Sequence, residues 1–345
     1  MKLYKLTIFI LIVFFKTETL FSENNFFSVN NIKLEKKDKI SNKALADEAI
    51  KLGFEQLSSR ILLQEDKRKL SDLIFSSIKQ LVVHYQITNN GEKENKVHFS
   101  VTFDKDKLHD LFYKKGISYS QISNKELYIL PVLIKENEIF VFNNNFFYES
   151  WNKIFENDLI EFILPIENIE IIQNINKYKT NLLTLELNDL FKEYKNKNLA
   201  LILIEDKKSS GIKVFIKSKI ERKNISKSVN LKRVLPNTDI FNEQVIIEIK
   251  KELINLIKSE NLIDIRTPSF LNVKLNLNNR SNLVELNTRI KKIGVIENVY
   301  VQEFNKDYME LKIKYLGKLD KIISLLKIEN IDLQLINDHW IIKTL

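Results

Sequence analysis

The chain of 345 residues contains no cysteine, and this absence limits its fold more than any other feature of the sequence. Without disulfides, iron–sulfur clusters or cysteine-bound zinc, the folded parts must be held together by hydrophobic cores alone. A chain of this length is too long for one core, so we expect two or three domains. Cysteine nucleophiles and lipid anchors attached to a cysteine are excluded for the same reason.

The first 22 residues have the pattern of a secretory signal peptide. Lys2 and Lys5 precede the apolar run Leu6–Phe15, and Leu20-Phe21-Ser22 ends in a small residue suited to cleavage. The run falls short of the roughly 20 apolar residues that a membrane-spanning helix needs. We therefore expect an exported, periplasmic protein. The alternative is a leader that stays uncleaved and tethers the chain to the inner membrane.

The basic balance of the chain has a compositional explanation. The net charge is +9, and cleavage after Ser22 would remove three lysines and one glutamate, leaving +7. Many Ile, Lys and Asn residues with only six Gly and four Pro are typical of an AT-rich genome, so a functional positive surface is not required. An exported chain meets anionic lipid head groups rather than DNA or RNA. Nucleic acid is therefore not expected as a partner, whereas an anionic membrane surface stays open.

Residues 23–120 are predicted to form an N-terminal α+β domain. Asn89-Asn90-Gly91 is a hairpin signal between two strands, and Gly116 is suited to end a helix. The expected elements are a strand near 29–34, helices over 42–63 and 70–81, strands over 81–88 and 96–104, and a helix over 105–116.

Residues 126–262 are predicted to form a central α/β layer domain. Leu199–Ile204 is a continuous apolar run, typical of a strand covered on both faces, and 212–220 alternates strictly between apolar and polar residues. Strands that alternate with helices imply a layered structure. The expected elements are strands over 127–134 and 138–143, a helix over 145–155, a strand over 160–165, a helix over 184–195, strands over 199–204 and 212–220, and a helix over 239–261.

Residues 268–345 are predicted to form a C-terminal ferredoxin-like domain with the order β-α-β-β-α-β. Leu283, Leu286, Ile290 and Ile293 form one face of its first helix, which we expect to stop at Gly294. The expected strands are 273–277, 296–304, 308–316, 331–335 and 340–343. The outward positions include Lys274, Glu310, Lys312 and Lys314, which do not match the aromatic face of an RNA-recognition sheet.

Several short phrases, in order, resemble those of an uncharacterised family of secreted proteobacterial proteins, domain-of-unknown-function family twenty-sixty-six. These phrases are Ala44–Ala49, Val101–Asp104, Leu130–Val132, Trp151, Leu164-Pro165, Tyr315–Gly317 and Trp340. The resemblance covers most of the chain after the leader, although the central domain has less tryptophan and glycine than the family would suggest. It implies export, but no activity, because the family has none assigned. The domains are also similar to small domains of envelope assembly factors, such as the flagellar assembly protein T and the amino-terminal domain of the Tol translocation protein B, which is an analogy of fold.

One cluster contains residue types that bind metals. Asp106, His109 and Asp110 would share a helix face at spacings of 3 and 4. Aspartates at the start of a helix also cap it and complement its dipole, and the glycine and terminal glutamate of an EF-hand are missing. We therefore expect helix capping, and no metal or cofactor. The other histidines, His84, His98 and His339, are scattered along the chain.

Lysines gather in the central domain. The segment 207–233 holds ten basic residues and one acidic residue, and Lys213, Lys217 and Lys219 share one face of the predicted strand 212–220. Such a face is typical of a solvated surface or of a guard against edge-to-edge pairing. The alternative is contact with acidic head groups or with an acidic partner.

Aromatic residues gather between 140 and 155, where most are expected in the core. Phe146 and Tyr148 fall off the face that carries Phe147 and Trp151, so they are candidates for an exposed contact patch. With the three lysines they make up the predicted partner surface.

The sequence therefore predicts a non-enzymatic envelope adaptor or assembly factor that binds an envelope protein. No serine is flanked as in a nucleophile elbow, and no glycine-rich loop could hold a phosphate. The alternative is a small-ligand binder or an enzyme with its site at a domain junction, where Asp104, Glu149 or Asp338 could supply carboxylates.

Overall fold

The computed structural model describes residues 26–35, 41–88, 96–122, 125–154, 159–194, 196–207, 211–233, 237–277, 281–337 and 339–344. They form two compact units. Unit 1 contains the described parts of 1–60, 65–118 and 264–345, and unit 2 those of 61–64 and 119–263. The mixture of helices with several separate sheets confirms the predicted α+β multidomain class. The predicted leader and the predicted hairpin turn at 89–91 lie outside the described residues.

The N-terminal part of unit 1 is a three-stranded antiparallel sheet with helices. The strand order is β1-β3-β2. Gly53 lies in the long helix at a close approach to this sheet, since a Cβ at this position would lie 3.1 Å from Ile32 Cδ1 and 3.4 Å from Val101 Cβ. The elements are β1 (Ser28–Glu35), α2 (Asn42–Ile61), α3 (Gln64–Arg68), α4 (Phe75–Gln80), β2 (Val82–Thr88), β3 (Lys96–Phe103) and α5 (Lys105–Lys115).

The predicted helix over 70–81 is wrong in its extent. Within this range only residues 75–80 are helical, as α4, whereas α3 ends before it and the residues between the two are held by turn hydrogen bonds such as Leu73 N to Leu70 O (3.2 Å). Ile74 is exposed and has an extended backbone, so an apolar side chain on the expected face is not part of the core. By contrast, α5 begins and ends as predicted, with Asp104 as its N-cap and Gly116 as a left-handed C-cap at φ 60°.

Unit 2 is built on a six-stranded mixed sheet. The strand order is β10-β9-β8-β5-β6, and β7 also pairs with β5. β5 runs parallel to β7 and β8, and the other pairs are antiparallel. The strands are β5 (Lys125–Lys135), β6 (Glu138–Phe140), β7 (Ile160–Ile163), β8 (Asn198–Asp206), β9 (Ile212–Ile220) and β10 (Lys223–Leu231). The short strands β4 (Tyr119–Ser120) and β11 (Leu262–Ile263) pair with each other.

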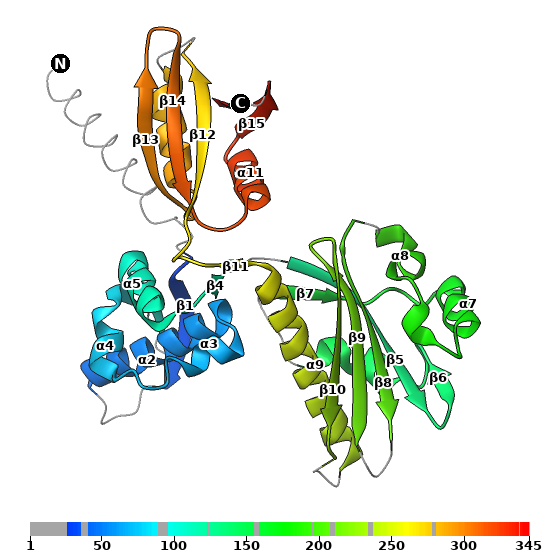
Figure 1. Ribbon diagram of the computed structural model, residues 1–345. Helices are drawn as coiled ribbons and strands as arrows, with labels where there is room; N and C mark the ends of the chain where they lie inside the picture. The colour runs from blue at the N-terminus through cyan, green and yellow to red at the C-terminus, as the bar shows by residue number, and fades with distance from the viewer. Residues whose placement is uncertain are drawn as a thin grey trace, which may run out of the picture. The chain divides into compact units, whose positions relative to one another are not determined.

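Helices cover both faces of this sheet, as Figure 1 shows. On one face are α6 (Phe146–Ser150), the 3₁₀ turn η2 (Trp151–Lys153) and α9 (Thr238–Glu260). On the other are α7 (Ile169–Lys177), η3 (Leu182–Thr184), α8 (Leu187–Leu190) and η4 (Lys192–Tyr194). β8 explains the predicted apolar run: Leu199, Leu201 and Leu203 enter the second core, while the residues between them enter the first.

Some elements of unit 2 differ from the prediction. The helix expected over 145–155 is α6 followed by η2, and the helix expected over 184–195 is a series of short turns. Neither α7 nor β10 is predicted from the sequence. β10 is an edge strand without a buried residue, so its strand periodicity is weak, whereas α7 has a clear helical pattern of isoleucines that the sequence prediction overlooked.

The C-terminal part of unit 1 has a five-stranded sheet in the order β13-β14-β12-β16-β15. β16 lies beside β12 and runs parallel to it, whereas β15 pairs only with β16. The last hairpin therefore places its second strand next to β12. The elements are β12 (Ser269–Asn276), α10 (Ser281–Lys291), β13 (Ile296–Phe304), β14 (Tyr308–Tyr315), α11 (Leu319–Ile328), β15 (Ile331–Ile336) and β16 (His339–Thr344).

The polar face of this sheet carries more aromatic side chains than the sequence predicts. Phe270 and Tyr300 are exposed, and lysines lie over neighbouring rings. Lys274 Nζ is 3.5 Å from the ring centroid of Tyr308, and Lys312 Nζ is 4.5 Å from that of Phe270. Phe270 precedes the predicted start of the first strand, which explains its omission from the expected face.

Candidate functional site

Asn145 holds together the sheet edge that carries the candidate site. β6 pairs with residues 133–135 of β5 and β7 pairs with 125–128, so the stretch between them has no strand partner on this edge. Pro131 lies there, where its missing N–H costs no ladder hydrogen bond. The buried Asn145 side chain fills the gap, because Nδ2 donates to the carbonyl oxygens of Pro131 (2.9 Å), Phe140 (3.1 Å) and Val141 (2.8 Å).

The same side chain starts helix α6. Asn145 Oδ1 accepts hydrogen bonds from the backbone N–H groups of Phe147 (3.1 Å) and Tyr148 (3.4 Å), as an N-cap does. The Tyr148 hydroxyl then donates to the carbonyl of Pro165 (2.8 Å), just after β7. Burial, and secondly the charge of Glu167, raise the pKa of Tyr148, so its hydroxyl remains a neutral donor. α6 is thereby tied to the loop that leads into α7.

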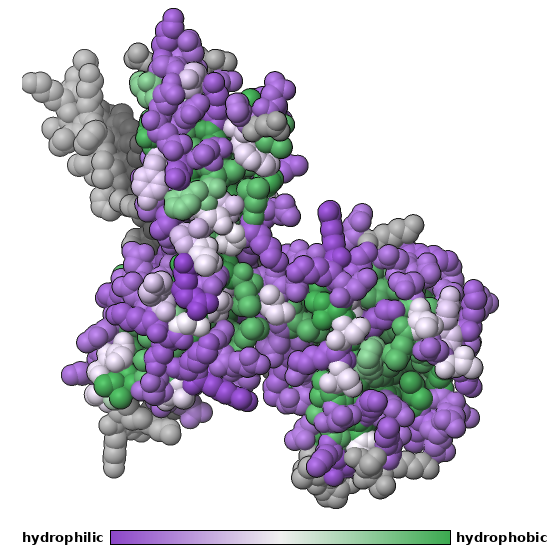
Figure 2. All heavy atoms as spheres, viewed as in Figure 1, coloured by the Kyte–Doolittle hydropathy of each residue, from purple (hydrophilic) through white to green (hydrophobic). Residues whose placement is uncertain are grey.

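Helix α7 has an inner and an outer apolar face. Asn168 caps it by accepting from Glu170 N (2.7 Å), and Ile171 and Ile175 are buried in the second core. Ile169 and Ile172 of α7 are 73% and 37% exposed, and Ile166, in the loop just before the helix, is 84% exposed. Figure 2 shows that hydrophobic residues lie among mostly hydrophilic ones on the visible face of unit 2. We call Ile166, Ile169 and Ile172 the isoleucine face.

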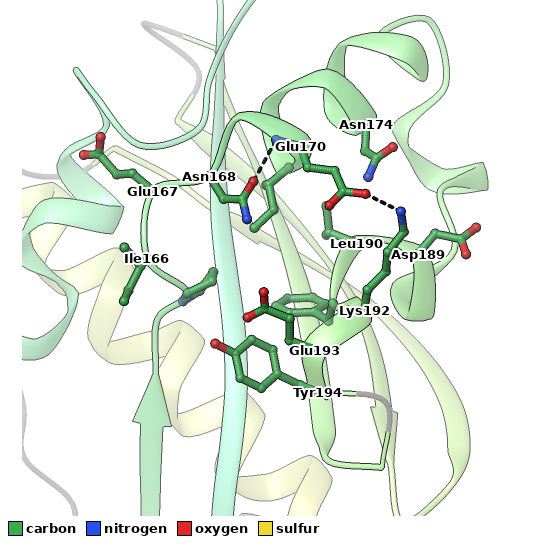
Figure 3. A pocket seen from close by; sticks show the side chains of 13 residues that line it. Ile166, Glu167, Asn168, Glu170, Asn174, Asp189, Leu190, Lys192, Glu193 and Tyr194 are labelled. Atoms are coloured by element: carbon green, nitrogen blue, oxygen red, sulfur yellow. Dashed lines mark hydrogen bonds and ion pairs between the residues drawn. The ribbon is translucent and has the colours of Figure 1, made fainter.

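A hollow of about 250 Å³ lies beside the isoleucine face. Its apolar floor comprises the buried residues Pro165, Ile171, Leu190 and Phe191. In Figure 3, Ile166 and Glu167 lie across the hollow from Lys192 and Asp189. The remaining lining residues are Asn168, Glu170, Asn174, Glu193 and Tyr194.

The hollow is acidic. Its lining has four carboxylates, Glu167, Glu170, Asp189 and Glu193, against the single amine of Lys192. Lys192 Nζ is paired with Glu170, and this hydrogen bond raises the pKa of Lys192 (Figure 3). The amine therefore stays charged and neutralises one carboxylate. The lining as a whole remains negative, although the protein is basic.

Tyr194 forms an aromatic wall of the hollow, and a second tyrosine supports its ring. Its ring stacks on Tyr128 at 4.3 Å between centroids. Glu126 Oε2 accepts from Lys197 Nζ at 2.7 Å and from the Tyr128 hydroxyl at 3.4 Å. The hydrogen bond from Lys197 lowers the pKa of Glu126, whereas burial, followed by the charge of Glu126, raises the pKa of Tyr128. These contacts restrict the rings that support Tyr194.

The predicted partner residues Phe146 and Tyr148 are half-buried and pack on opposite sides of the sheet. Phe146 contacts the first core with α9, and Tyr148 contacts the second core with α7. Phe142, Phe147 and Trp151 of the same aromatic group are buried. A role for Phe146 and Tyr148 in partner binding stays a prediction.

Two of the three predicted lysines bind neighbouring segments of the fold. Lys217 Nζ donates to the carbonyls of Leu183 (3.0 Å) and Leu185 (2.9 Å), and Lys219 Nζ donates to Asn188 Oδ1 (3.0 Å). These bonds fix η3 and α8 over the polar side of β9. Lys213 is exposed. The structure therefore adds an anchoring role that the sequence did not indicate.

The residues considered as metal ligands, Asp106, His109 and Asp110, all lie on helix α5. Asp104 Oδ1 accepts from the N–H groups of Asp106 (3.0 Å) and Lys107 (3.1 Å) as the cap of α5. His109 is largely buried and packs edge-on against Phe27. Its Nδ1 atom lies 3.6 Å from Glu297 Oε1. A group of three His, Asp or Glu side chains placed to hold a metal ion does not occur among the described residues.

The carboxylates considered for a catalytic site have different surroundings. Asp104 is a helix cap, Glu149 is an exposed residue of α6, and Asp338 lies outside the described residues.

The isoleucine face and the hollow were not identified from the sequence. The available signal was the segment 163–175, which contains more isoleucines than one buried helix stripe requires. The acidic residues of the hollow come from two separate segments, 167–170 and 189–193, and only the fold brings them together.

Neither models of known protein families nor curated proteins match this chain. In the described part of the chain, no helix is long and apolar enough to cross a membrane.

Proposed function

We propose that this protein is an exported, periplasmic adaptor or assembly factor that acts by binding another envelope protein rather than by catalysis. The observation that supports this proposal is the isoleucine face, which is exposed on α7 and on the loop just before it, while the other side of α7 is already packed. Exposed apolar patches bordered by polar residues commonly mark protein interfaces. The leader pattern of residues 1–22 supports the compartment.

A small-ligand binder or an enzyme with its site at a domain junction is the alternative, and the hollow, which lies within unit 2, does not supply such a site. Ligand sites usually enclose roughly 300–1,000 Å³ and bury most of the ligand. The hollow is smaller, at about 250 Å³, and its rim is exposed and charged. Such a surface suits a side chain of a partner better than a whole metabolite.

We also propose domain boundaries, a topology for the last domain and a family relation. We infer three domains at 23–120, 126–262 and 268–345, the last a variant of the ferredoxin-like sandwich whose final hairpin inserts β16 beside β12. We also infer a relation to domain-of-unknown-function family twenty-sixty-six, supported by the order of the shared short phrases. An anionic membrane surface near Lys213 remains a second partner to test.

The experiment compares partner capture by three forms of the mature protein. The wild type, the double variant Ile166→Ser/Ile169→Ser and the control Ile240→Ser are each crosslinked in envelope extract. Ile240 is also an exposed isoleucine of unit 2, but it lies on α9. We expect a defined protein to crosslink to the wild type and the control but not to the double variant, and to bind again when purified. Capture that is equal for all three forms would contradict the proposal.

A further inference from the structure

We propose that the isoleucine face and the hollow bind an amphipathic segment of a partner that carries both apolar and basic side chains. Its apolar residues would cover Ile166, Ile169 and Ile172, and a lysine or arginine would enter the hollow. This inference rests on the proposed function and names the chemistry of the partner.

The rim of the hollow carries carboxylates that are not neutralised. Glu170 is neutralised by Lys192, whereas Glu167, Asp189 and Glu193 form no ion pair with any lysine or arginine that the structure describes. Of these three, Glu167 directly follows Ile166 of the isoleucine face, and all three line the hollow beside that face. A basic segment would gain attraction at this rim, and an acidic one would be repelled.

The form of the hollow also favours a basic side chain. Its floor is apolar, Tyr194 is an aromatic wall, and the carboxylates lie at the rim (Figure 3). Lysine and arginine side chains have an apolar stem and a charged end, and their cations bind the faces of aromatic rings. The stem can therefore contact Leu190 and Tyr194 while the cation lies near the carboxylates.

The negative charge of the rim also disfavours negatively charged partners. Nucleic acid and anionic lipid carry negative charge, which the acidic rim would repel. A second copy of this chain would have to place its own apolar and basic residues here, and the experiment below tests that arrangement.

The test measures binding of a defined peptide to the purified mature protein. The probe is a fluorescent amphipathic peptide of about 15 residues, with leucines on one helical face and lysines on the other. One matched peptide has glutamate in place of lysine, and another has serine in place of leucine. We expect binding of the leucine–lysine peptide only, weakened by high salt because surface charges are screened.

Variants then assign the binding to the site. We expect Glu167→Gln/Glu193→Gln and Ile166→Ser/Ile169→Ser each to weaken binding by roughly tenfold, equivalent to about 1.4 kcal/mol. The control Glu243→Gln/Ile240→Ser changes the same residue types on α9, where both are exposed, and should bind like the wild type. Thermal unfolding of each variant checks that it is folded.

The outcomes separate the two proposals. Equal binding of the glutamate peptide, or unchanged binding by the glutamine variant, would overturn the partner chemistry. If capture from the envelope nevertheless depends on the isoleucines, the adaptor function stands, and only the proposed basic, amphipathic character of the partner is rejected. Self-association of the wild type that the isoleucine variant abolishes, measured by sedimentation, would identify a second copy as the occupant and overturn the inference.

Discussion

At the residue scale, the Asn145 side chain lies within hydrogen-bonding distance of five backbone groups, with its two amide hydrogens shared among three carbonyl oxygens. Asn145→Ala would leave buried carbonyl and N–H groups without partners in the gap between β6 and β7. We expect a loss of about 2–4 kcal/mol in the free energy of unfolding, because unsatisfied buried polar groups are costly. Urea unfolding followed by circular dichroism measures the change.

Two further variants test this explanation. Asn143→Ala changes an exposed asparagine two residues away, and we expect a change within about 0.5 kcal/mol. Asn145→Asp keeps an acceptor for α6 but places a carboxylate against three carbonyl oxygens, so it should destabilise at least as much as alanine. A mild effect of aspartate would show that the Nδ2 contacts matter little.

His109 predicts a pH dependence of stability. The pKa of His109 is lowered from the ordinary 6.5, mainly by burial and secondly by the charge of Lys105. The charges of Glu297 and Asp106 act in the opposite direction but are weaker. As the pH falls below about 6.5, the unfolded chain takes up a proton that the folded chain does not yet bind, so folding stability decreases. Above this pH the contribution is fully present. The measurement is the free energy of unfolding at several pH values between 7.5 and 5.5.

The variant His109→Gln should make stability less dependent on pH in this window. Its absolute stability can change as well, so the slope against pH is the readout. His84→Gln, at an exposed histidine of β2, is the matched control and should keep the wild-type slope. An unchanged slope in His109→Gln would reject burial of this histidine as the cause.

At the element scale, Gly211 allows β9 to start close to the end of β10. Its φ is 111°, and a Cβ would lie 2.2 Å from the carbonyl oxygen of Leu231. Gly211→Ala should lower the free energy of unfolding by about 2–4 kcal/mol, because backbone strain and overpacking add. Gly294→Ala is the control, since its Cβ would meet no atom within 4 Å. A loss in both variants would point to a general effect of removing glycine.

Most elements with a strong pattern were predicted well, but α7 has such a pattern and was missed, whereas β10 lacks one. β8 is apolar throughout because both its faces are buried, and α5 carries its own cap residues, so local sequence determines both. α7 places isoleucines inside and outside, and β10 is stabilised mainly by pairing with β9. For β10 the determining contacts come from another strand, which periodicity does not reveal, whereas α7 could have been found from its isoleucine spacing and its Asn168 cap.

At the scale of the whole molecule, the candidate site depends on long-range contacts. The lysines of β9 looked free in the sequence, yet Lys217 and Lys219 hold a segment about 30 residues earlier in the chain. The acidic hollow likewise joins residues on both sides of the connection between α7 and α8. Sequence patterns indicated that the central domain carries charged and apolar surface, but not which residues meet.

The division into two units predicts that they unfold independently. Each unit contains one tryptophan whose fluorescence reports on its unfolding. Trp151 lies in unit 2 and Trp340 in unit 1, and the chain has two tryptophans in all. In a Trp340→Phe background, Asn145→Ala should lower the urea midpoint of the Trp151 fluorescence. In a Trp151→Phe background, the same substitution should leave the Trp340 transition unchanged, because separate cores unfold separately.

The reciprocal variant completes this test. Ile342 is buried in β16, and Ile342→Ala should cost about 2–5 kcal/mol through loss of packing in unit 1. It should therefore shift the Trp340 transition and leave that of Trp151 in place. Transitions that move together in both experiments would mean that the two units unfold as one cooperative structure. In that case, substitutions on the isoleucine face would also have to be checked for effects on unit 1.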